Sequence, residues 1–344
     1  MKLLRYRREI EYCTYCPKLC RFACPVANAD ARETLTPTSK MTLLHLIGEG
    51  ALGWSREVAE TLYMCTGCLA SRTFCDHQIE VFPTYIAARE EAMRRGFAPE
   101  KVYQQDRTIR EHRNPYGRDL ARELDGWVPS RLICKDAETI FFAGCVTTQF
   151  YPRHIEDAIA LLISVESDFG IYLDKTICCG YPSHATGQRD TFELLARACG
   201  EGLKNARRIV TLCPTCAHMI KDVYPEAGVR IPAEVFHISQ YLIPYLRSGK
   251  LKFKKKAAGR VIYHDPCYLG RYLGAYDEPR QLLSEAVDEL LEFPWNKEES
   301  YCCGGGGGLL LTSPKTALEI IRKRAAEVES KAPDVIASAC PTCD

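Results

Sequence analysis

The sequence lacks the features that mark membrane, secreted and nucleic-acid-binding proteins. It contains no uninterrupted apolar stretch near the ~18 residues that a transmembrane helix requires. Its N-terminus has no apolar core of the kind that signal peptides have. Its 45 basic and 44 acidic residues leave a net charge of +1, which gives no general attraction to nucleic acid or to an anionic membrane. We therefore expect a cytoplasmic chain without a membrane span, peripheral to a membrane only through a partner subunit.

A nucleotide-binding glycine loop is also missing. The glycines at 304–308 follow two cysteines and do not have GxGxxG spacing, so no flavin or NAD is expected in this chain. A different cofactor is indicated by the 19 cysteines, an odd number that argues against a disulfide scaffold in a chain of this length. Thiolates in CxxC clusters bind zinc or iron–sulfur clusters, and both are candidates.

Two cysteine runs lie near the N-terminus. The first has the pattern C-x2-C-x3-C-x3-C-P and consists of Cys13, Cys16, Cys20, Cys24 and Pro25. The second contains Cys65, Cys68 and Cys75, with Ser71 where another cysteine would belong. The Cys-Pro ending favours iron–sulfur clusters, and a pair of structural zinc knuckles is the alternative. Between the runs we expect two helices, one capped by Thr38 or Ser39 and one over 56–64 capped by Ser55.

This arrangement resembles the alpha-helical ferredoxin domains of fumarate reductase and heterodisulfide reductase iron–sulfur subunits. The resemblance implies two [4Fe–4S] cubanes between helices, with the cysteine before proline crossing to the other cubane. One cubane would take Cys13, Cys16, Cys20 and Cys75. The other would take Cys24, Cys65 and Cys68. At its fourth position, Ser71 or a water could be the ligand, the cluster could be [3Fe–4S], or the site could be empty.

The remainder of the chain repeats a pattern of apolar segments and helical segments. In the first copy we expect strands beginning at 139, 171 and 208, with helices at 155–164 and 192–205. In the second we expect a strand at 260–267, helices at 279–292 and 314–331, and a strand beginning at 334. Each copy is therefore a βαβαβ unit, which implies a parallel sheet with right-handed crossovers. The first copy continues into helix-like segments at 217–224 and 235–246 that the second lacks, so either the chain is truncated or this end is capped by something else.

The predicted fold class is α+β and multidomain: an N-terminal alpha-helical ferredoxin domain, then two repeated Rossmann-like βαβαβ units. We place the ferredoxin-like domain at 1–95 and a helical connector at 96–135, and we expect the charges of the helical stretch at 84–130 to form a solvated face. The first unit spans 136–250, and the second spans 257–344 without its final helices. The basic run at 249–256 is expected to be an exposed linker, and a docking patch for an acidic partner is the alternative.

Each copy contributes five cysteines near the carboxyl ends of its strands, where open α/β sheets place their ligands. Five thiolates are one too many for tetrahedral zinc or a regular cubane. Only the second double cysteine is followed by five glycines, so we expect that side to be the more open. The two sets are Cys145, Cys178, Cys179, Cys213 and Cys216, then Cys267, Cys302, Cys303, Cys340 and Cys343.

At these residues the chain resembles the CCG-domain iron–sulfur family, and within it the fused type of heterodisulfide reductase catalytic subunit. The resemblance implies that each five-cysteine set holds a noncubane [4Fe–4S] cluster. It further implies an iron–sulfur subunit of an oxidoreductase complex, in which electrons pass from the cubanes to the noncubane clusters and reduce a disulfide or thiol substrate.

Candidates for proton transfer and substrate binding are less specific. A lone histidine is more often structural than catalytic, and His264, His184, His154 and His218 are the candidates near the cysteines. Arg271 and Arg280 can bind an anionic substrate, but they can equally cap helices or pair with Asp277 and Glu278. Cys199 is expected to be a core residue, and Cys134 has no assigned role.

The alternative function is electron transfer without a substrate of its own. Such a subunit would relay electrons to or from a flavin, quinone or metal-cofactor partner, as in a benzoyl-CoA reductase-type complex. Both readings require redox partners, of the flavoprotein, ferredoxin, cytochrome b or hydrogenase type. A structural zinc protein is the third hypothesis.

Overall fold

The chain folds into two compact units. The computed structural model describes residues 2–133, 137–165 and 168–344, so Cys134 lies outside the described residues. Unit 1 consists of Met1–Asp106, Pro182–Arg189 and Pro294–Ser330, and unit 2 of Arg107–Tyr181, Asp190–Phe293 and Lys331–Asp344. Among the described residues, every helix is too short or too polar to cross a lipid bilayer. These units are defined by the contacts between residues, and their limits do not coincide with those of the sequence repeats. The domain boundaries inferred from the sequence therefore stay a prediction.

Unit 1 is helical, as the ferredoxin pattern predicts. The side chain of Ser55 accepts a hydrogen bond from the Val58 amide at 3.3 Å, which confirms it as the N-cap of the second predicted helix. The first predicted helix begins earlier than expected, because Thr36 caps it in place of Thr38 or Ser39. The helices are α1 (Arg7–Thr14), α2 (Pro25–Asp30), α3 (Pro37–Gly48), α4 (Arg56–Tyr63), α5 (Ala70–Thr73), α6 (Val81–Arg95), α16 (Leu309–Thr312) and α17 (Pro314–Ala326), with α7 (Glu100–His112) leading out of the unit.

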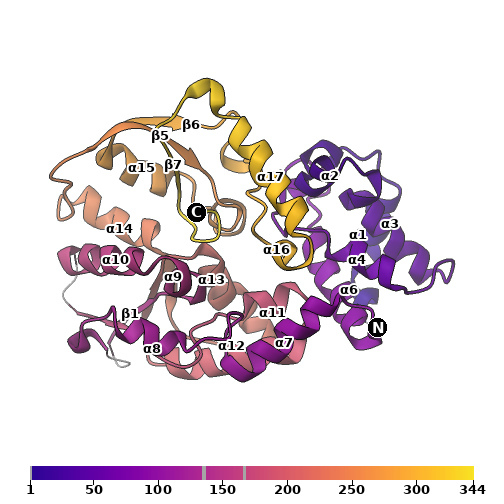
Figure 1. Cartoon of the computed structure of the whole chain (residues 1–344), viewed down its shortest axis with the longest axis horizontal. Helices are drawn as coiled ribbons and strands as arrows, with labels where there is room; N and C mark the ends of the chain where they lie inside the picture. The colour runs from indigo at the N-terminus through magenta and orange to yellow at the C-terminus, as the bar shows by residue number, and fades with distance from the viewer. Residues whose placement is uncertain (1, 134–136, 166–167) are drawn as a thin grey trace. The chain divides into compact units, whose positions relative to one another are not determined.

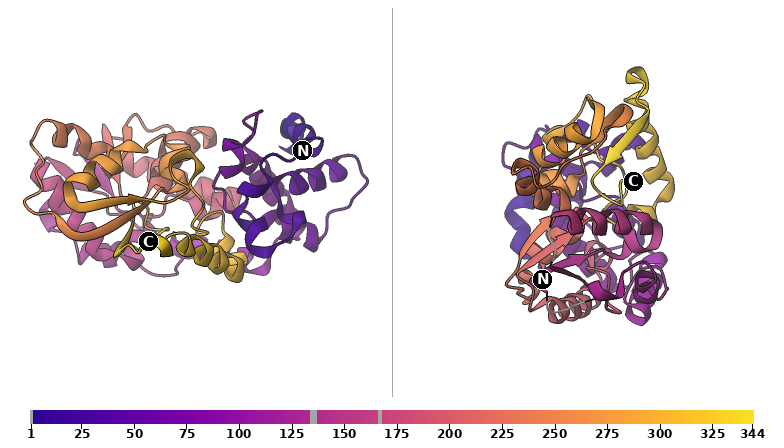
Figure 2. Two further views of the ribbon diagram at one scale, coloured as in Figure 1. Left: turned by 90° about the horizontal axis from the view of Figure 1, so that it is seen from above. Right: turned by 90° about the vertical axis from the view of Figure 1, so that its left-hand side faces the viewer.

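Helix α17 belongs to the core of unit 1 although it is far from α1–α6 in the sequence. It packs against α2, as Figures 1 and 2 show. Cys24 and Met64 share a buried apolar cluster with Ala317 and Ile320. The hydroxyl of Thr316 also donates to the carboxylate of Asp30 at 2.7 Å. The helical domain therefore completes its core with a segment from the second sequence repeat.

Unit 2 contains two parallel sheets, one from each repeat. The first has the order β2-β1-β3-β4, and the second has the order β6-β5-β7. All strand pairs among the described residues are parallel, which confirms the prediction from the alternation of strands and helices. The strands are β1 (Thr139–Phe142), β2 (Phe169–Ile171), β3 (Arg208–Thr211), β4 (Glu234–His237), β5 (Ala257–His264), β6 (Val287–Glu292) and β7 (Val335–Ser338).

The helices of unit 2 cover these sheets. Beneath α10 and α14, a buried apolar cluster joins β1 to both helices through residues such as Phe141, Ile159 and Leu242. Helix α14 of the first repeat lies beside α15 of the second (Figure 1). The helices are α8 (Leu120–Asp125), α9 (Cys145–Phe150), α10 (Pro152–Val165), α11 (Tyr181–Ala185), α12 (Arg189–Leu203), α13 (Pro214–His218), α14 (Ile238–Arg247) and α15 (Asp277–Ala286), of which α11 and α12 also include residues of unit 1.

Several predicted segments differ from the structure, and the strand predicted at 260–267 and the helix predicted at 314–331 end earlier, at His264 and Ala326. The helix predicted at 279–292 ends at Ala286, and its second half forms β6 beside β5. The helix-like segment at 235–246 begins as β4 before it enters α14, and the strand predicted from Ile171 ends at that residue. At β6 and β4 the pairing of a short segment with a parallel neighbour overrides a sequence that also suits a helix.

His237 caps α14 in a way that fixes its protonation state. Its Nδ1 accepts from the Ser239 amide at 3.2 Å, so its Nε2 carries the proton and donates to the Leu212 carbonyl at 3.0 Å. Protonation of Nδ1 would remove the cap acceptor. Burial lowers the pKa of His237 to about 4, from an ordinary value of 6.5. The folded chain therefore needs the neutral imidazole.

This cap predicts a loss of stability in mild acid. The unfolded chain binds a proton at His237 near pH 6.5, and the folded chain binds it only near pH 4. The neutral His237 therefore makes its full contribution to the free energy of unfolding above pH 6.5. This contribution is lost as the pH falls towards 4, up to about 3 kcal/mol. Urea denaturation at several pH values should show this slope in the native protein. His237→Asn keeps a cap acceptor and should flatten the slope; an unchanged slope would assign the pH dependence to other groups.

Candidate metal centres

Four cysteines of unit 1 form the first group of thiols, here called site 1: Cys13, Cys16, Cys20 and Cys75. Cys13 lies in the last turn of α1, and Cys75 lies just after α5. Burial, together with the neighbouring thiolates of Cys20, Cys75 and Cys16, raises the pKa of Cys13 to about 12. Burial also raises the pKa of Cys20 to about 11, again with Cys75 and Cys16 contributing. The structure thus brings the cysteine from the second run to the three from the first.

A second group, site 2, consists of Cys24, Cys65 and Cys68, together with Ser71. Cys24 is buried at the N-terminus of α2, and burial raises its pKa. The neighbouring charge of Lys40 opposes this shift, while Cys65 and Cys68 add to it. Ser71 is buried on α5. The grouping of thiols follows the crossed pattern, although the assignment of each cysteine to a cluster stays a prediction.

Site 3 comprises the five cysteines of the first repeat, all within unit 2: Cys145, Cys178, Cys179, Cys213 and Cys216. They lie beyond the carboxyl ends of β1, β2 and β3, and each is 5% exposed or less. Hydrogen bonds between thiols link Cys145 to Cys178, Cys178 to Cys179, Cys179 to Cys216 and Cys216 to Cys213. The contact with Cys145 raises the pKa of Cys178, that with Cys178 raises the pKa of Cys179, and those with Cys179 and Cys213 raise the pKa of Cys216, in each case with burial contributing. The pKa of Cys213 is lowered instead, because its thiolate accepts from Cys216.

Gly144 explains how these thiols come so close to the backbone. Its φ is +80°, and a Cβ at this position would lie 3.2 Å from the Sγ of Cys216. Five converging and buried thiols fit a polynuclear iron–sulfur centre better than a mononuclear zinc ion, which takes four ligands. Since a metal binds thiolates, its binding would have to release protons from this group.

The five cysteines of the second repeat, site 4, are divided between the units. Cys302 and Cys303 lie in unit 1, and Cys267, Cys340 and Cys343 lie in unit 2. Cys302 is buried and Cys303 is half-buried.

In unit 1 the glycine run after Cys303 has a packing role. A Cβ on Gly307 would lie 2.0 Å from the Cys65 carbonyl oxygen and 2.6 Å from the Thr66 carbonyl carbon. A Cβ on Gly308 would lie 2.6 Å from a methyl carbon of Thr186. Glycine is needed because the backbone of site 2 approaches this loop closely, which gives a reason for the glycines other than an open face.

The other predicted site residues are found in different settings. His264 is buried in unit 2, with its ring 5.9 Å from that of Phe293, and Arg271 is buried in the same unit. His184 lies on α11 in the part assigned to unit 1. Arg280 donates to both oxygens of Asp265 at 2.7 Å and also binds Glu292, two carboxylates that the sequence did not suggest as its partners. Arg280 is thereby held as a structural residue.

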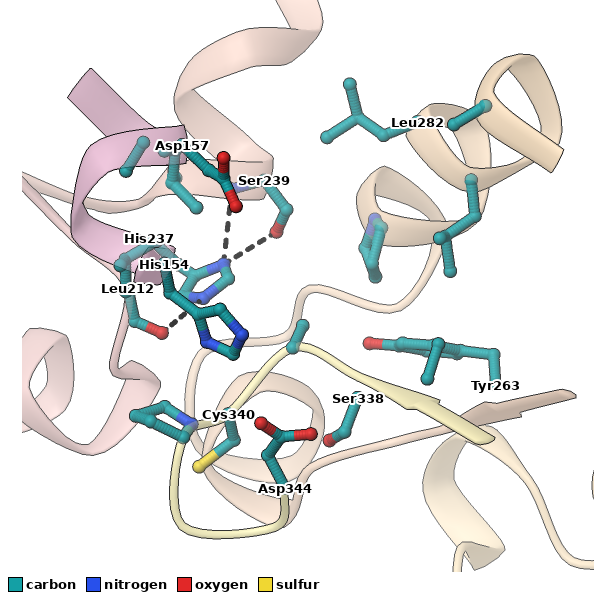
Figure 3. A pocket seen from close by; sticks show the side chains of 18 of the residues that line it. His154, Asp157, Leu212, His237, Ser239, Tyr263, Leu282, Ser338, Cys340 and Asp344 are labelled. Carbon is teal, nitrogen blue, oxygen red and sulfur yellow. Dashed lines mark hydrogen bonds between the residues drawn. The ribbon is translucent and has the colours of Figure 1, made fainter. Parts of the chain in front are cut away.

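A cavity of about 520 Å³ lies in unit 2 beside Cys340, between α10, α14, α15 and β7. Its walls are largely aliphatic, as Leu282 illustrates, and Tyr263 points its hydroxyl into it (Figure 3). Within the described part of the chain, three buried hydroxyls on its wall have no hydrogen-bond partner: Thr147, Tyr263 and Ser338. The cavity is therefore suited to an apolar molecule that also offers hydrogen-bonding atoms.

Two buried cations beside site 2 were missed in the sequence. Arg89 is 0% exposed and Lys40 is 1% exposed. The charges after residue 84 were expected to form a solvated face, which is wrong for Arg89. A signal was present, because Arg89 follows Tyr85 by four residues and precedes Ala92 by three, so it lies on the apolar stripe of α6.

Comparison with known proteins supports the iron–sulfur reading. The cysteine-rich domain (CCG) matches residues 139–221 and 261–344, and the 4Fe-4S dicluster domain matches residues 9–79. The chain is similar to one subunit of the dihydromethanophenazine:CoB–CoM heterodisulfide reductase of Methanosarcina mazei, with 28% identity over 359 residues, 97% of this chain and 87% of that protein. Both family resemblances predicted from the cysteines are confirmed.

Two further relatives belong to other redox systems. The EtfAB:quinone oxidoreductase of Syntrophomonas wolfei is 28% identical over 335 residues, 91% of this chain and 45% of that protein. One subunit of the fumarate reductase (CoM/CoB) of Methanothermobacter marburgensis is 30% identical over 290 residues, 83% of this chain and 56% of that protein. An iron–sulfur electron-transfer subunit accounts for all three relationships.

Proposed function

The chain belongs to the family that joins a 4Fe-4S dicluster domain to cysteine-rich CCG domains, and from this premise we propose that it is the iron–sulfur subunit of a heterodisulfide reductase-like complex. When bound, the clusters supply one-electron transfer and, at the five-cysteine sites, the reduction of a disulfide. The observation that carries this proposal is site 3, where five buried thiols converge within one unit.

The cysteines have distinct roles in this proposal. Site 1 holds a [4Fe–4S] cubane, and site 2 holds either a second cubane with Ser71 or water as fourth ligand, or a [3Fe–4S] cluster. Sites 3 and 4 each hold a noncubane [4Fe–4S] cluster. Iron is thus bound through Cys13, Cys16, Cys20, Cys75, Cys24, Cys65, Cys68, Cys145, Cys178, Cys179, Cys213, Cys216, Cys267, Cys302, Cys303, Cys340 and Cys343.

Reduction of a disulfide needs two electrons and two protons, which produce two thiols. We assign the protons to His264 or His184 and the binding of an anionic substrate to Arg271. The cavity beside Cys340 supports an organic substrate, because its aliphatic walls and unpaired hydroxyls suit a molecule with an apolar chain and a polar end.

Electron paramagnetic resonance of the oxidised protein with added thiol tests the proposal. A site that splits disulfides should bind the thiol sulfur in a paramagnetic state, and a thiol enriched in ³³S should broaden that signal. The alcohol of the same structure is the matched control and should give no signal. A protein that contains the expected iron but gives no thiol-dependent signal would contradict disulfide reduction and favour simple electron relay.

The relay function is the second candidate, and the similarity to an EtfAB:quinone oxidoreductase favours it. In that case a flavoprotein or quinone partner would exchange electrons with the chain. In either case we propose a cytoplasmic subunit with redox partners of the flavoprotein, ferredoxin, cytochrome b or hydrogenase type, and attachment to a membrane through such a partner.

A further inference from the structure

Arg89 is an extensively hydrogen-bonded buried cation of unit 1. Its Nε donates to the Leu62 carbonyl at 3.1 Å, and its Nη2 donates to the Tyr63 and Cys65 carbonyls at 3.1 and 3.2 Å. Its Nη1 donates to the Ala185 and Gly307 carbonyls at 2.6 and 2.7 Å. A guanidinium has five N–H groups, so these five carbonyls match its whole donor capacity.

The five acceptors come from three separate segments. Cys65 opens the second ferredoxin run, Ala185 follows the double cysteine of the first repeat, and Gly307 follows that of the second. Gly187 allows this approach, because a Cβ there would lie 2.5 Å from the Arg89 carbonyl carbon. One side chain therefore holds the segment of site 2 together with the segments that follow both double cysteines.

The carbonyl acceptors are neutral, so they satisfy the donors of Arg89 without cancelling its charge. A buried charge is costly, and arginine does not deprotonate in proteins. Lys40 adds a second buried cation, whose Nζ donates to the Met64 carbonyl next to Cys65. The backbone of Leu62–Cys65 thus lies against two positive charges. An anionic iron–sulfur cluster at site 2 is a group that these charges would stabilise.

We infer that Arg89, together with Lys40, positions the Cys65 loop and raises the reduction potential of the cluster at site 2 above that of the cluster at site 1. This inference rests on the proposed function, because it requires clusters at both sites. A nearby positive charge stabilises the reduced cluster, which carries one more negative charge. When unit 1 takes up one electron, that electron then resides at site 2. Site 2 lies next to the segments of Ala185 and Gly307, whose carbonyls Arg89 also binds.

The surroundings of the two sites differ in the expected direction. Glu9 precedes Cys13 of site 1 by one turn of α1, so site 1 has an acidic neighbour, whereas the cation of Lys40 lies against the segment before Cys65 of site 2. In addition, three of the four cysteines of site 1 are half-buried, namely Cys16, Cys20 and Cys75, whereas only Cys65 of the three cysteines of site 2 is. The more accessible site 1 is suited to receive electrons, and site 2 to retain them.

A redox titration of the holoprotein, followed by electron paramagnetic resonance, tests this inference. Arg89→Gln removes the charge and should lower the reduction equilibrium constant of the site 2 cluster about tenfold relative to site 1, or about 59 mV for a one-electron couple. Arg89→Lys keeps the charge with at most three donors, so it should restore most of the potential. Arg324→Gln is the control, because Arg324 is a buried arginine of the same unit that pairs with Glu327; it should leave the difference between the sites unchanged.

Each outcome separates the inference from the function on which it rests. Normal iron content with an unchanged potential in Arg89→Gln would overturn the role of Arg89. A wild-type protein that binds no iron at sites 1 and 2 would instead overturn the proposed function. If Arg89→Gln does not fold, Lys40→Met carries the test, and it should lower the potential of site 2 in the same direction; no shift there would overturn the inference.

Discussion

Replacement of Cys178 by alanine is expected to remove the metal cluster of site 3 and with it the reduction of a disulfide. Cys178 is 0% exposed and joins Cys145 to Cys179 in the row of thiols at site 3. Without it the site has four sulfur ligands and a gap between them. We expect the loss of about four iron atoms per chain and a fall in turnover of about a hundredfold or more. Iron analysis and the visible absorption spectrum measure the first effect, and a thiol-release assay measures the second.

Cys199→Ala is the matched control for this experiment. Cys199 is as deeply buried as Cys178, and its thiol donates to the carbonyls of Thr176 at 3.2 Å and Cys178 at 3.5 Å. It belongs to no cysteine motif, so its loss should cost about 1 kcal/mol of stability and no iron. Equal iron loss in both variants, or full iron content in Cys178→Ala, would contradict the assignment of site 3.

Gly307→Ala should destabilise unit 1 strongly, although it adds only one methyl group. The new Cβ would overlap the backbone of Cys65 and Thr66, and backbone atoms cannot move aside as a flexible side chain does. The substitution also disturbs the carbonyl that accepts from Arg89. We expect a loss of about 4 kcal/mol or more, together with release of iron from site 2. Thermal unfolding and iron analysis would measure both effects.

Gly50→Ala separates the two causes of this loss. Gly50 also has a positive φ, +73°, but a Cβ at that position would meet nothing within 4 Å. The cost of placing alanine in the left-handed region is about 1–2 kcal/mol, and this variant should show that cost alone. If both variants lose the same stability, the close approach of the glycine loop to Cys65 has no energetic importance.

The cysteine spacing was enough to predict the iron–sulfur family, because the distances between ligands along the chain are set by the local geometry of the cluster-binding segments. The parallel sheets and the helical ferredoxin domain were foreseen for a related reason, since both follow from periodic apolar segments. What the sequence could not reveal is packing between distant segments. β6 reads as the end of a helix until its pairing with β5 is seen, and Arg89 reads as a surface charge until five carbonyls are found around it.

Packing between distant segments also bears on the glycine run. From the sequence, five glycines after Cys303 suggested exposure to a substrate or partner. In the structure Gly307 is buried, and its lack of a side chain serves the contact with Cys65. A glycine can allow two backbones to pack closely, or it can leave space for a substrate or partner to approach. The two roles look alike in the sequence, so only the neighbours of each glycine in the structure can distinguish them.

Unit 1 is built from segments that lie far apart in the sequence, and this affects when it can fold and bind iron during synthesis. Arg89 leaves the ribosome 96 residues before Ala185 and 218 residues before Gly307, two of the residues whose carbonyls it binds. Native contacts between such distant segments form late and leave the N-terminal helices incomplete during synthesis. Insertion of iron at site 2 is therefore expected to be a post-translational event in a nearly finished chain, and a nascent chain that stops before Gly307 would present the cysteines of site 2 without their final support.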